Sequence, residues 1–138
     1  MKRNVTPRHR QRGVAAVEFA LVLPLLLTVV MGAIDWGWFF FIDQVVTNCA
    51  REAARAGTLL APPPTSKTSD AVSAANQAGS DFLKAVKFKD QGVDASVVTV
   101  NGGNAIKVTV TYPVGSLTGL LSNIMPANVH ATAVMKWQ

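Results

Sequence analysis

An uncharged apolar run from Phe19 to Ile34 is the feature that most limits how this 138-residue chain can fold. With the flanking residues from Val14 included, the segment would be about 32 Å long as an α-helix. That length matches the hydrocarbon core of a bilayer, which is about 30 Å thick. The run therefore predicts one transmembrane helix over residues 14–34, with the lipid bilayer as a partner.

The positive charges are concentrated ahead of this run. Five of the 13 lysines and arginines lie in residues 1–13, and all eight acidic residues lie after Gly13. Because cation-rich flanks stay in the cytoplasm, residues 1–13 are expected to be a cytoplasmic basic leader, with the C-terminal head in the periplasm. Residues 14–138 then carry eight cations and eight acids, a balance that argues against a nucleic-acid partner.

Aromatic residues follow the run at the point where the helix would leave the lipid: Trp36, Trp38, Phe39, Phe40 and Phe41. They suit an aromatic belt at the membrane interface, and the alternative is that they belong to the core of the head. A cleaved signal peptide is the alternative for the run itself. Its one passable site, Val30-Met31-Gly32, precedes aromatic and apolar residues that are unlike a mature N-terminus.

An acidic residue, Glu18, lies one turn inside the apolar segment, where an unpaired carboxylate is costly. If the chain were cut between Gly13 and Val14, the new α-amino group of Val14 would lie four residues before Glu18 on one helix face. Glu18 could then pair with its own amino terminus or with that of a neighbouring subunit. The alternative is that Glu18 reaches the headgroups and stays hydrated.

These residues also carry a family resemblance. The heptad Gly13-Val14-Ala15-Ala16-Val17-Glu18-Phe19 resembles the prepilin-peptidase site of the tight-adherence branch of type IV pilins. The longer stretch from Arg12 to Leu27 and a second stretch from Asn48 to Gly57 are similar to TadE-like proteins. The resemblance implies cleavage after Gly13 by a prepilin peptidase, with a processing site made of Gly13, Val14, Glu18 and Phe19.

The same resemblance implies a function. It points to a minor pilin, or pseudopilin, of an Flp-type pilus system in a bacterial inner membrane, with incorporation into an extracellular pilus as one outcome. The implied partners are other pilin subunits, major and minor, the prepilin peptidase and an inner-membrane assembly platform. One alternative is an uncleaved accessory protein that scaffolds a secretion platform from the periplasm. A further alternative is a membrane-tethered module that binds a ligand.

Pro24 and Glu18 are the residues expected to matter for helix packing. A proline inside a helix removes one backbone hydrogen bond and predicts a kink. The kink is either a packing feature or, by analogy with pilins, a point that eases extraction from the membrane. Glu18 would set the register of helix packing if it pairs with a neighbouring subunit.

The helix is expected to continue beyond the membrane, because apolar residues recur at three- and four-residue steps as far as Ala54. Residues 14–57 are therefore predicted to form a transmembrane and extended N-terminal helix, with Gly57 as its C-terminal cap. Cys49 lies on the apolar stripe and is expected to be a small core residue. Three consecutive prolines from Pro62 mark residues 58–70 as a linker.

Residues 71–138 are predicted to be an α+β head. Asp70 can cap a second helix that ends before Gly92, with a buried face made of Val72, Ala75, Ala78, Phe82, Ala85 and Val86. Alternating apolar residues predict strands over 93–100, 106–112 and 129–137. Asn101 to Asn104 has the composition of a hairpin turn, so a three-stranded antiparallel sheet is expected. Residues 116–125 are predicted to form a short helix.

No catalytic or metal-binding constellation is expected. His9 lies in the leader and His130 in a strand, so no pair of histidines is available for metal binding or general base chemistry. Cys49 is the only cysteine, which excludes a disulfide within the chain. We therefore expect a protein that is not an enzyme and has no cofactor.

Overall fold

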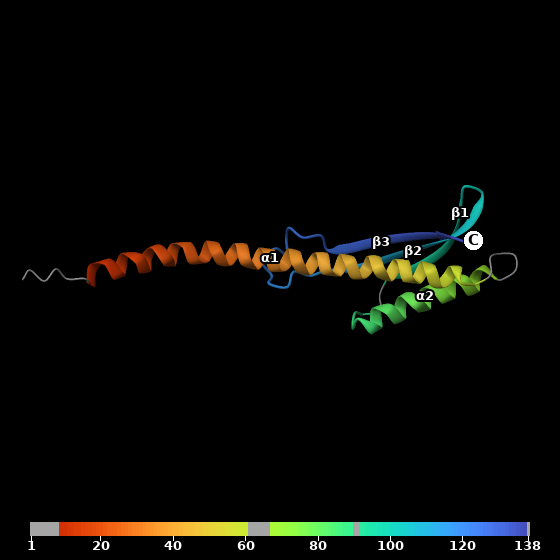
Figure 1. The fold of residues 1–138 in the computed structure, drawn as a ribbon, viewed down its shortest axis with the longest axis horizontal. Helices are drawn as coiled ribbons and strands as arrows, with labels where there is room; N and C mark the ends of the chain where they lie inside the picture. The colour runs from red at the N-terminus through yellow and green to blue at the C-terminus, as the bar shows by residue number, and fades with distance from the viewer. Residues whose placement is uncertain (1–8, 61–66, 90–91, 138) are drawn as a thin grey trace, which may run out of the picture.

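The structure is a computed structural model that describes residues 9–60, 67–89 and 92–137, with side chains from residue 13 onward. Its elements follow in the order α1 (His9–Thr58), α2 (Thr68–Ala85), β1 (Val93–Val100), β2 (Gly103–Pro113) and β3 (Asn128–Lys136). The predicted α+β class is confirmed. In the sequence, the two helices precede a three-stranded antiparallel sheet (Figure 1). Residues 1–8 of the predicted leader and 61–66 of the predicted linker lie outside the described residues.

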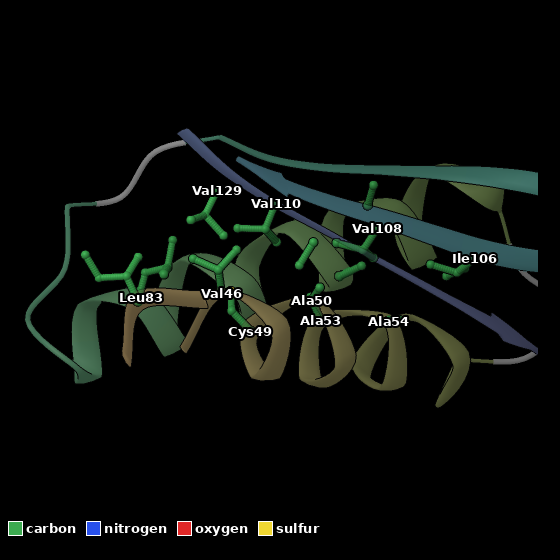
Figure 2. Packing of buried hydrophobic residues seen from close by; sticks show 14 of the residues in the cluster. Val46, Cys49, Ala50, Ala53, Ala54, Leu83, Ile106, Val108, Val110 and Val129 are labelled. Atoms are coloured by element: carbon green, nitrogen blue, oxygen red, sulfur yellow. The ribbon is translucent and has the colours of Figure 1, made fainter. Parts of the chain in front are cut away.

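The environment of α1 changes at Asp35. Residues 13–34 are exposed or partly exposed, whereas buried residues recur on one face of the helix from Asp35 onward. This face supplies much of the core of the head: Ile42, Val46, Cys49, Ala50, Ala53 and Ala54. Figure 2 shows Val46 to Ala54 facing residues of α2, β2 and β3. The C-terminal half of α1 is therefore the central helix of the head, and Cys49 is buried in the core as predicted.

The helix α2 runs back along the C-terminal half of α1 (Figure 1). Its buried residues are Ala71, Ala75, Gly79 and Leu83, so the predicted face missed three of the four. Of the predicted residues, Ala75 is buried and Val72 and Phe82 are partly buried against the core, whereas Ala85 and Val86 are exposed. The physical reason is close approach: a Cβ at Gly79 would lie 2.7 Å from Cγ1 of Val93 and 3.3 Å from Cβ of Ala53. Small residues therefore face α1, and larger ones such as Phe82 lie at the edge of the core.

Two predicted helix caps were also wrong. Lys67 holds the N-cap position of α2 and makes no side-chain capping bond, whereas Asp70 lies in the first turn. Gly57 is not a C-terminal cap but a packing residue inside α1, because a Cβ there would clash with Cδ1 of Ile106 and lie 3.0 Å from the carbonyl oxygen of Ala71. Only a residue without a side chain lets these three elements meet.

The sheet has the order β1-β2-β3, with both pairs antiparallel as predicted. Asn101 and Gly102 join β1 to β2 with positive φ at both positions, 50° and 77°, which suits the right-handed twist of a tight hairpin. The alternation in β2 turns Ile106, Val108 and Val110 toward the helices. The apolar faces of sheet and helices thus share one core (Figure 2).

The connection between β2 and β3, residues 114–127, is called here the β2–β3 loop. It contains turns and no helix, so the short helix predicted over 116–125 was wrong. Gly119 has φ +81°, which interrupts a helical path, and the Thr118 N–H donates to Asp35 instead of to a helical carbonyl. The N–H of Val114 donates to the carbonyl of Ala127 at 2.9 Å and closes the base of the loop.

Candidate functional site

The N-terminal half of α1 exposes an apolar surface that no other described part of the chain covers. α1 is long and apolar enough to cross a membrane, and its most apolar 18-residue window has a mean hydropathy of 2.5 with none of its residues buried. Large apolar side chains are exposed all round this half, including Phe19, Leu21, Val22 and Leu27. A helix that is apolar on every side is stable in lipid or among other apolar helices. Within the residues that the structure describes, this half of α1 is therefore the candidate membrane span.

The predicted processing residues lie together on the first turns of this exposed half. Gly13, Val14, Glu18 and Phe19 are all exposed and helical. A Cβ placed on Gly13 would have no neighbour within 4 Å, so packing does not require a glycine there. Val14 and Glu18 are four residues apart on a regular helix, which brings their side chains to the same face.

Pro24 lies inside α1 without breaking it. The helix is continuous from His9 to Thr58, and Figure 1 shows a gentle bend in its N-terminal half. The hydroxyl of Thr28 donates to the carbonyl of Pro24 at 2.8 Å, a bond within one helical turn. Such back-bonding by threonine bends helices slightly, so Thr28 and Pro24 together locate a flexure inside the apolar half.

Asp35 is a buried acid at the junction between the exposed half of α1 and the head. Its side chain is 0% exposed and accepts hydrogen bonds from three residues of the β2–β3 loop. Oδ1 accepts from the N–H of Thr118 at 2.8 Å. Oδ2 accepts from the hydroxyls of Ser116 and Thr118, each at 2.7 Å, and from the N–H of Leu121 at 3.4 Å. The loop therefore wraps a carboxylate supplied by a residue more than eighty positions earlier.

These hydrogen bonds hold the carboxylate in its charged form. Burial acts to raise the pKa of Asp35, but the Thr118 N–H, the hydroxyls of Ser116 and Thr118 and the Leu121 N–H act to lower it. The net effect lowers the pKa from 3.8 to about 2. Asp35 lies just beyond residues 14–34, and it is ionised at neutral pH. A charged acceptor with this set of donors makes a stronger anchor for the loop than a neutral one would.

The aromatic residues after Asp35 divide between the two predicted roles. Trp36, Phe40 and Phe41 are exposed, as a belt at the membrane interface requires. Trp38 and Phe39 are partly buried and pack against the core of the head. The head-core interpretation is therefore correct for Trp38 and Phe39, and the belt stays a prediction for Trp36, Phe40 and Phe41.

The role of Asp35 is the main feature that sequence reasoning missed. In the sequence it is an interruption between two apolar stretches, and its partners are too far along the chain to be read from local spacing. The available signals were an acid at the end of a predicted membrane span and a loop that contains Ser116, Thr118 and no charged residue. Together they indicate that the Asp35 carboxylate, as an acceptor, and the Ser116 and Thr118 hydroxyls, as donors, require hydrogen-bond partners.

A groove at the far end of the head is lined by Arg55, Thr58, Leu59, Met135, Lys136 and Trp137. Some of its polar groups are already engaged. Arg55 lies 4.0 Å from the carboxylate of Glu52, and Nε1 of Trp137 donates to the carbonyl of Leu60 at 2.9 Å. The groove therefore gives no specific support to a ligand-binding function.

Comparison with known proteins links this geometry to one family. Residues 13–55 match the model of the TadE-like protein family. No curated protein and no solved structure matches the chain. The matched segment begins at the predicted cleavage site, includes the whole exposed apolar half of α1 and Asp35, and ends in the part of α1 that forms the core of the head. The chain therefore carries a TadE-like region in the helix that joins its membrane span to its head.

Proposed function

We propose that the protein is a minor pilin, or pseudopilin, of a Tad-type pilus system and that it acts as a structural subunit without catalytic activity. The observation that carries the proposal is the TadE-like match over residues 13–55, which falls on a helix with an exposed apolar half and a buried half. Such a helix can transfer its apolar half from lipid to a bundle of similar helices, since both surroundings are apolar.

Processing would add a charged amino group to the start of this helix, where it could guide assembly. A prepilin peptidase cutting after Gly13 leaves the amino group of Val14 at the start of the apolar half, four residues before Glu18. In a low-dielectric environment the ammonium and the carboxylate attract strongly, whether they belong to one chain or to neighbours. Pairing between neighbours would fix the register at which one pilin helix packs on the next. The flexure at Pro24 and Thr28 would then lie within the packed segment.

The orientation proposed follows from the charge distribution. Residues 1–13 would remain in the cytoplasm until they are removed, and the head would lie in the periplasm of a bacterial inner membrane. Major and minor pilin subunits, the prepilin peptidase and the assembly platform are the expected partners. Because α1 is continuous from the apolar half into the core of the head, a subunit fixed by its apolar half would also have the orientation of its head fixed.

The experiment that tests this function is co-purification of the membrane-extracted protein with other pilin subunits. Glu18→Gln keeps the shape of the side chain and removes its charge, so membrane insertion should persist while co-purification falls. Glu52→Gln is the matched control, because Glu52 is an exposed glutamate on the same helix within the head. If both variants co-purify as well as the unchanged protein, Glu18 is merely hydrated at the interface, and the pairing with Val14 is excluded. If the unchanged protein co-purifies with no pilin subunit, the minor-pilin function is excluded.

A further inference from the structure

The β2–β3 loop exposes apolar side chains that do not pack into the core of the head. Leu117, Leu120 and Ile124 are 62%, 47% and 73% exposed. The loop contains no lysine, arginine, aspartate or glutamate between positions 114 and 127. Exposed leucine and isoleucine side chains that lie together on one uncharged loop indicate an interaction site for a membrane or another apolar surface.

The position of this loop is fixed relative to the membrane span. With the span expected over residues 14–34, Asp35 is the first residue beyond it, so α1 would leave the hydrocarbon core at the level of Asp35. Hydrogen bonds from Ser116, Thr118 and Leu121 hold the loop beside Asp35. Figure 1 shows the loop, in blue, lying beside α1 at the end of the head that faces the N-terminal half. With that span, the loop would lie at the height of the lipid headgroups, on the side where the head lies.

The neighbouring part of α1 has the composition of a membrane interface. Trp36 and Phe40 are exposed one residue and five residues after Asp35, and their rings lie 5.9 Å apart. Aromatic side chains of this kind collect at the boundary between headgroups and acyl chains. The exposed apolar residues of the loop and the exposed aromatic residues thus lie at the same level along α1, and neither group carries a charge.

We propose that the β2–β3 loop inserts Leu117, Leu120 and Ile124 into the headgroup and upper acyl region of the bilayer that α1 crosses, and that Asp35 positions the loop to do so. The backbone of a loop cannot enter the hydrocarbon core, where its polar groups would lose their partners. At the interface the backbone stays hydrated while the apolar side chains are buried. The head would then rest on the membrane through two contacts, the α1 span and the loop. This inference needs α1 to span a bilayer and is independent of processing or pilus assembly.

The test uses an environment-sensitive fluorophore on a single introduced cysteine in the full chain, reconstituted into phosphatidylcholine vesicles. Cys49 is buried, so unchanged protein treated with the reagent provides the blank. The label goes on Leu120→Cys in the loop. Leu59→Cys is the matched control, because Leu59 is also exposed but lies just past the end of α1, about 36 Å from Asp35 along the helix axis. Leu27→Cys in the membrane span confirms insertion.

Quenching by lipids that carry a nitroxide on the acyl chain then reports depth. We expect the label at position 120 to be quenched more by a nitroxide near the headgroup than by one near the chain end. The label at position 27 should show the reverse order, and the label at position 59 should not be quenched. Equal emission at position 120 with and without nitroxide lipids, while position 27 is quenched, would overturn the proposal. So would a label at position 120 that becomes shielded only when pilin subunits are added.

The role of Asp35 needs its own variant. In Asp35→Ala the loop loses the acceptor for Ser116, Thr118 and Leu121, so quenching at position 120 should fall while quenching at position 27 stays the same. Asp43→Ala removes a charge from the same helix two turns further on and should leave both signals unchanged. Undiminished quenching in Asp35→Ala would refute the positioning role of Asp35.

Discussion

Thr118 binds Asp35 twice, through its backbone N–H to Oδ1 at 2.8 Å and through its hydroxyl to Oδ2 at 2.7 Å. The two residues are 83 positions apart in the chain. This pair joins the end of the membrane span to the loop between β2 and β3. It therefore connects the exposed apolar half of α1 to the part that folds as an α+β head.

Removing this acceptor should release the loop without unfolding the head. In Asp35→Ala we expect the amide hydrogens of Thr118 and Leu121 to exchange with solvent at least roughly tenfold faster, because hydrogen bonds to charged groups are among the stronger ones. The core of α1, α2 and the sheet does not include Asp35 and should keep its protection. Hydrogen exchange followed by mass spectrometry on peptides covering the loop measures this directly. Asp43→Ala serves as the control, and unchanged exchange in the loop of Asp35→Ala would show that these bonds do not hold it.

The attachment of the loop should also depend on pH in a defined direction. The pKa of Asp35 is lowered from 3.8 to about 2, so its ionised form is favoured by the attached state. The contribution to stability is therefore fully present above about pH 4 and is lost as the pH falls toward 2. A fluorophore at position 120 in detergent micelles should report constant signal from pH 7 to about 4 and a change below that. The change should be absent in Asp35→Asn, whose side chain does not ionise, and a transition well above pH 4 in the unchanged protein would contradict the account.

At Gly79, α2 packs closely against Val93 and Ala53, and a side chain there should be costly. Gly79→Ala would place a Cβ 2.7 Å from Cγ1 of Val93, and overpacking of this kind destabilises by about 1–3 kcal/mol. The measurement is chemical or thermal unfolding of the protein in detergent, followed by tryptophan fluorescence. Gly37→Ala is the matched control, since Gly37 is also helical but a Cβ added there would have no neighbour within 4 Å. It should be neutral or stabilised by up to about 1 kcal/mol. Equal stability of the two variants would refute the packing role of Gly79.

The elements of the head were predictable where the signal is local. The alternation of Ile106, Val108 and Val110 and the turn at Asn101 and Gly102 are properties of neighbouring residues, and the structure confirms both. The long apolar helix, which is the candidate membrane span, was equally predictable from its length and lack of charge. The buried face of α2 was not predictable, because it depends on how closely Gly79 approaches Val93 on a strand that comes later in the chain.

The candidate site was predictable only in its first part. Gly13, Val14 and Glu18 stand out within a few residues of one another, so their spacing could be read directly. Asp35 could not be assigned, because its partners are brought to it by the folding of the whole head. The same bonds help to explain why the loop did not become the short helix that its residues suggested, since the N–H groups of Thr118 and Leu121 donate to Asp35 rather than to helical carbonyls.

The most direct test of the proposed function is the intact mass of the protein purified from the membranes in which it is made. A prepilin site at Gly13 predicts a mature chain that starts at Val14, with residues 1–13 absent. Gly13→Ala should leave a longer species, while Gly32→Ala, at a glycine in the same helix where an added Cβ would have no neighbour within 4 Å, should be processed normally. A mass that retains residues 1–13 in the unchanged protein would contradict the account and favour an uncleaved accessory protein of the inner membrane.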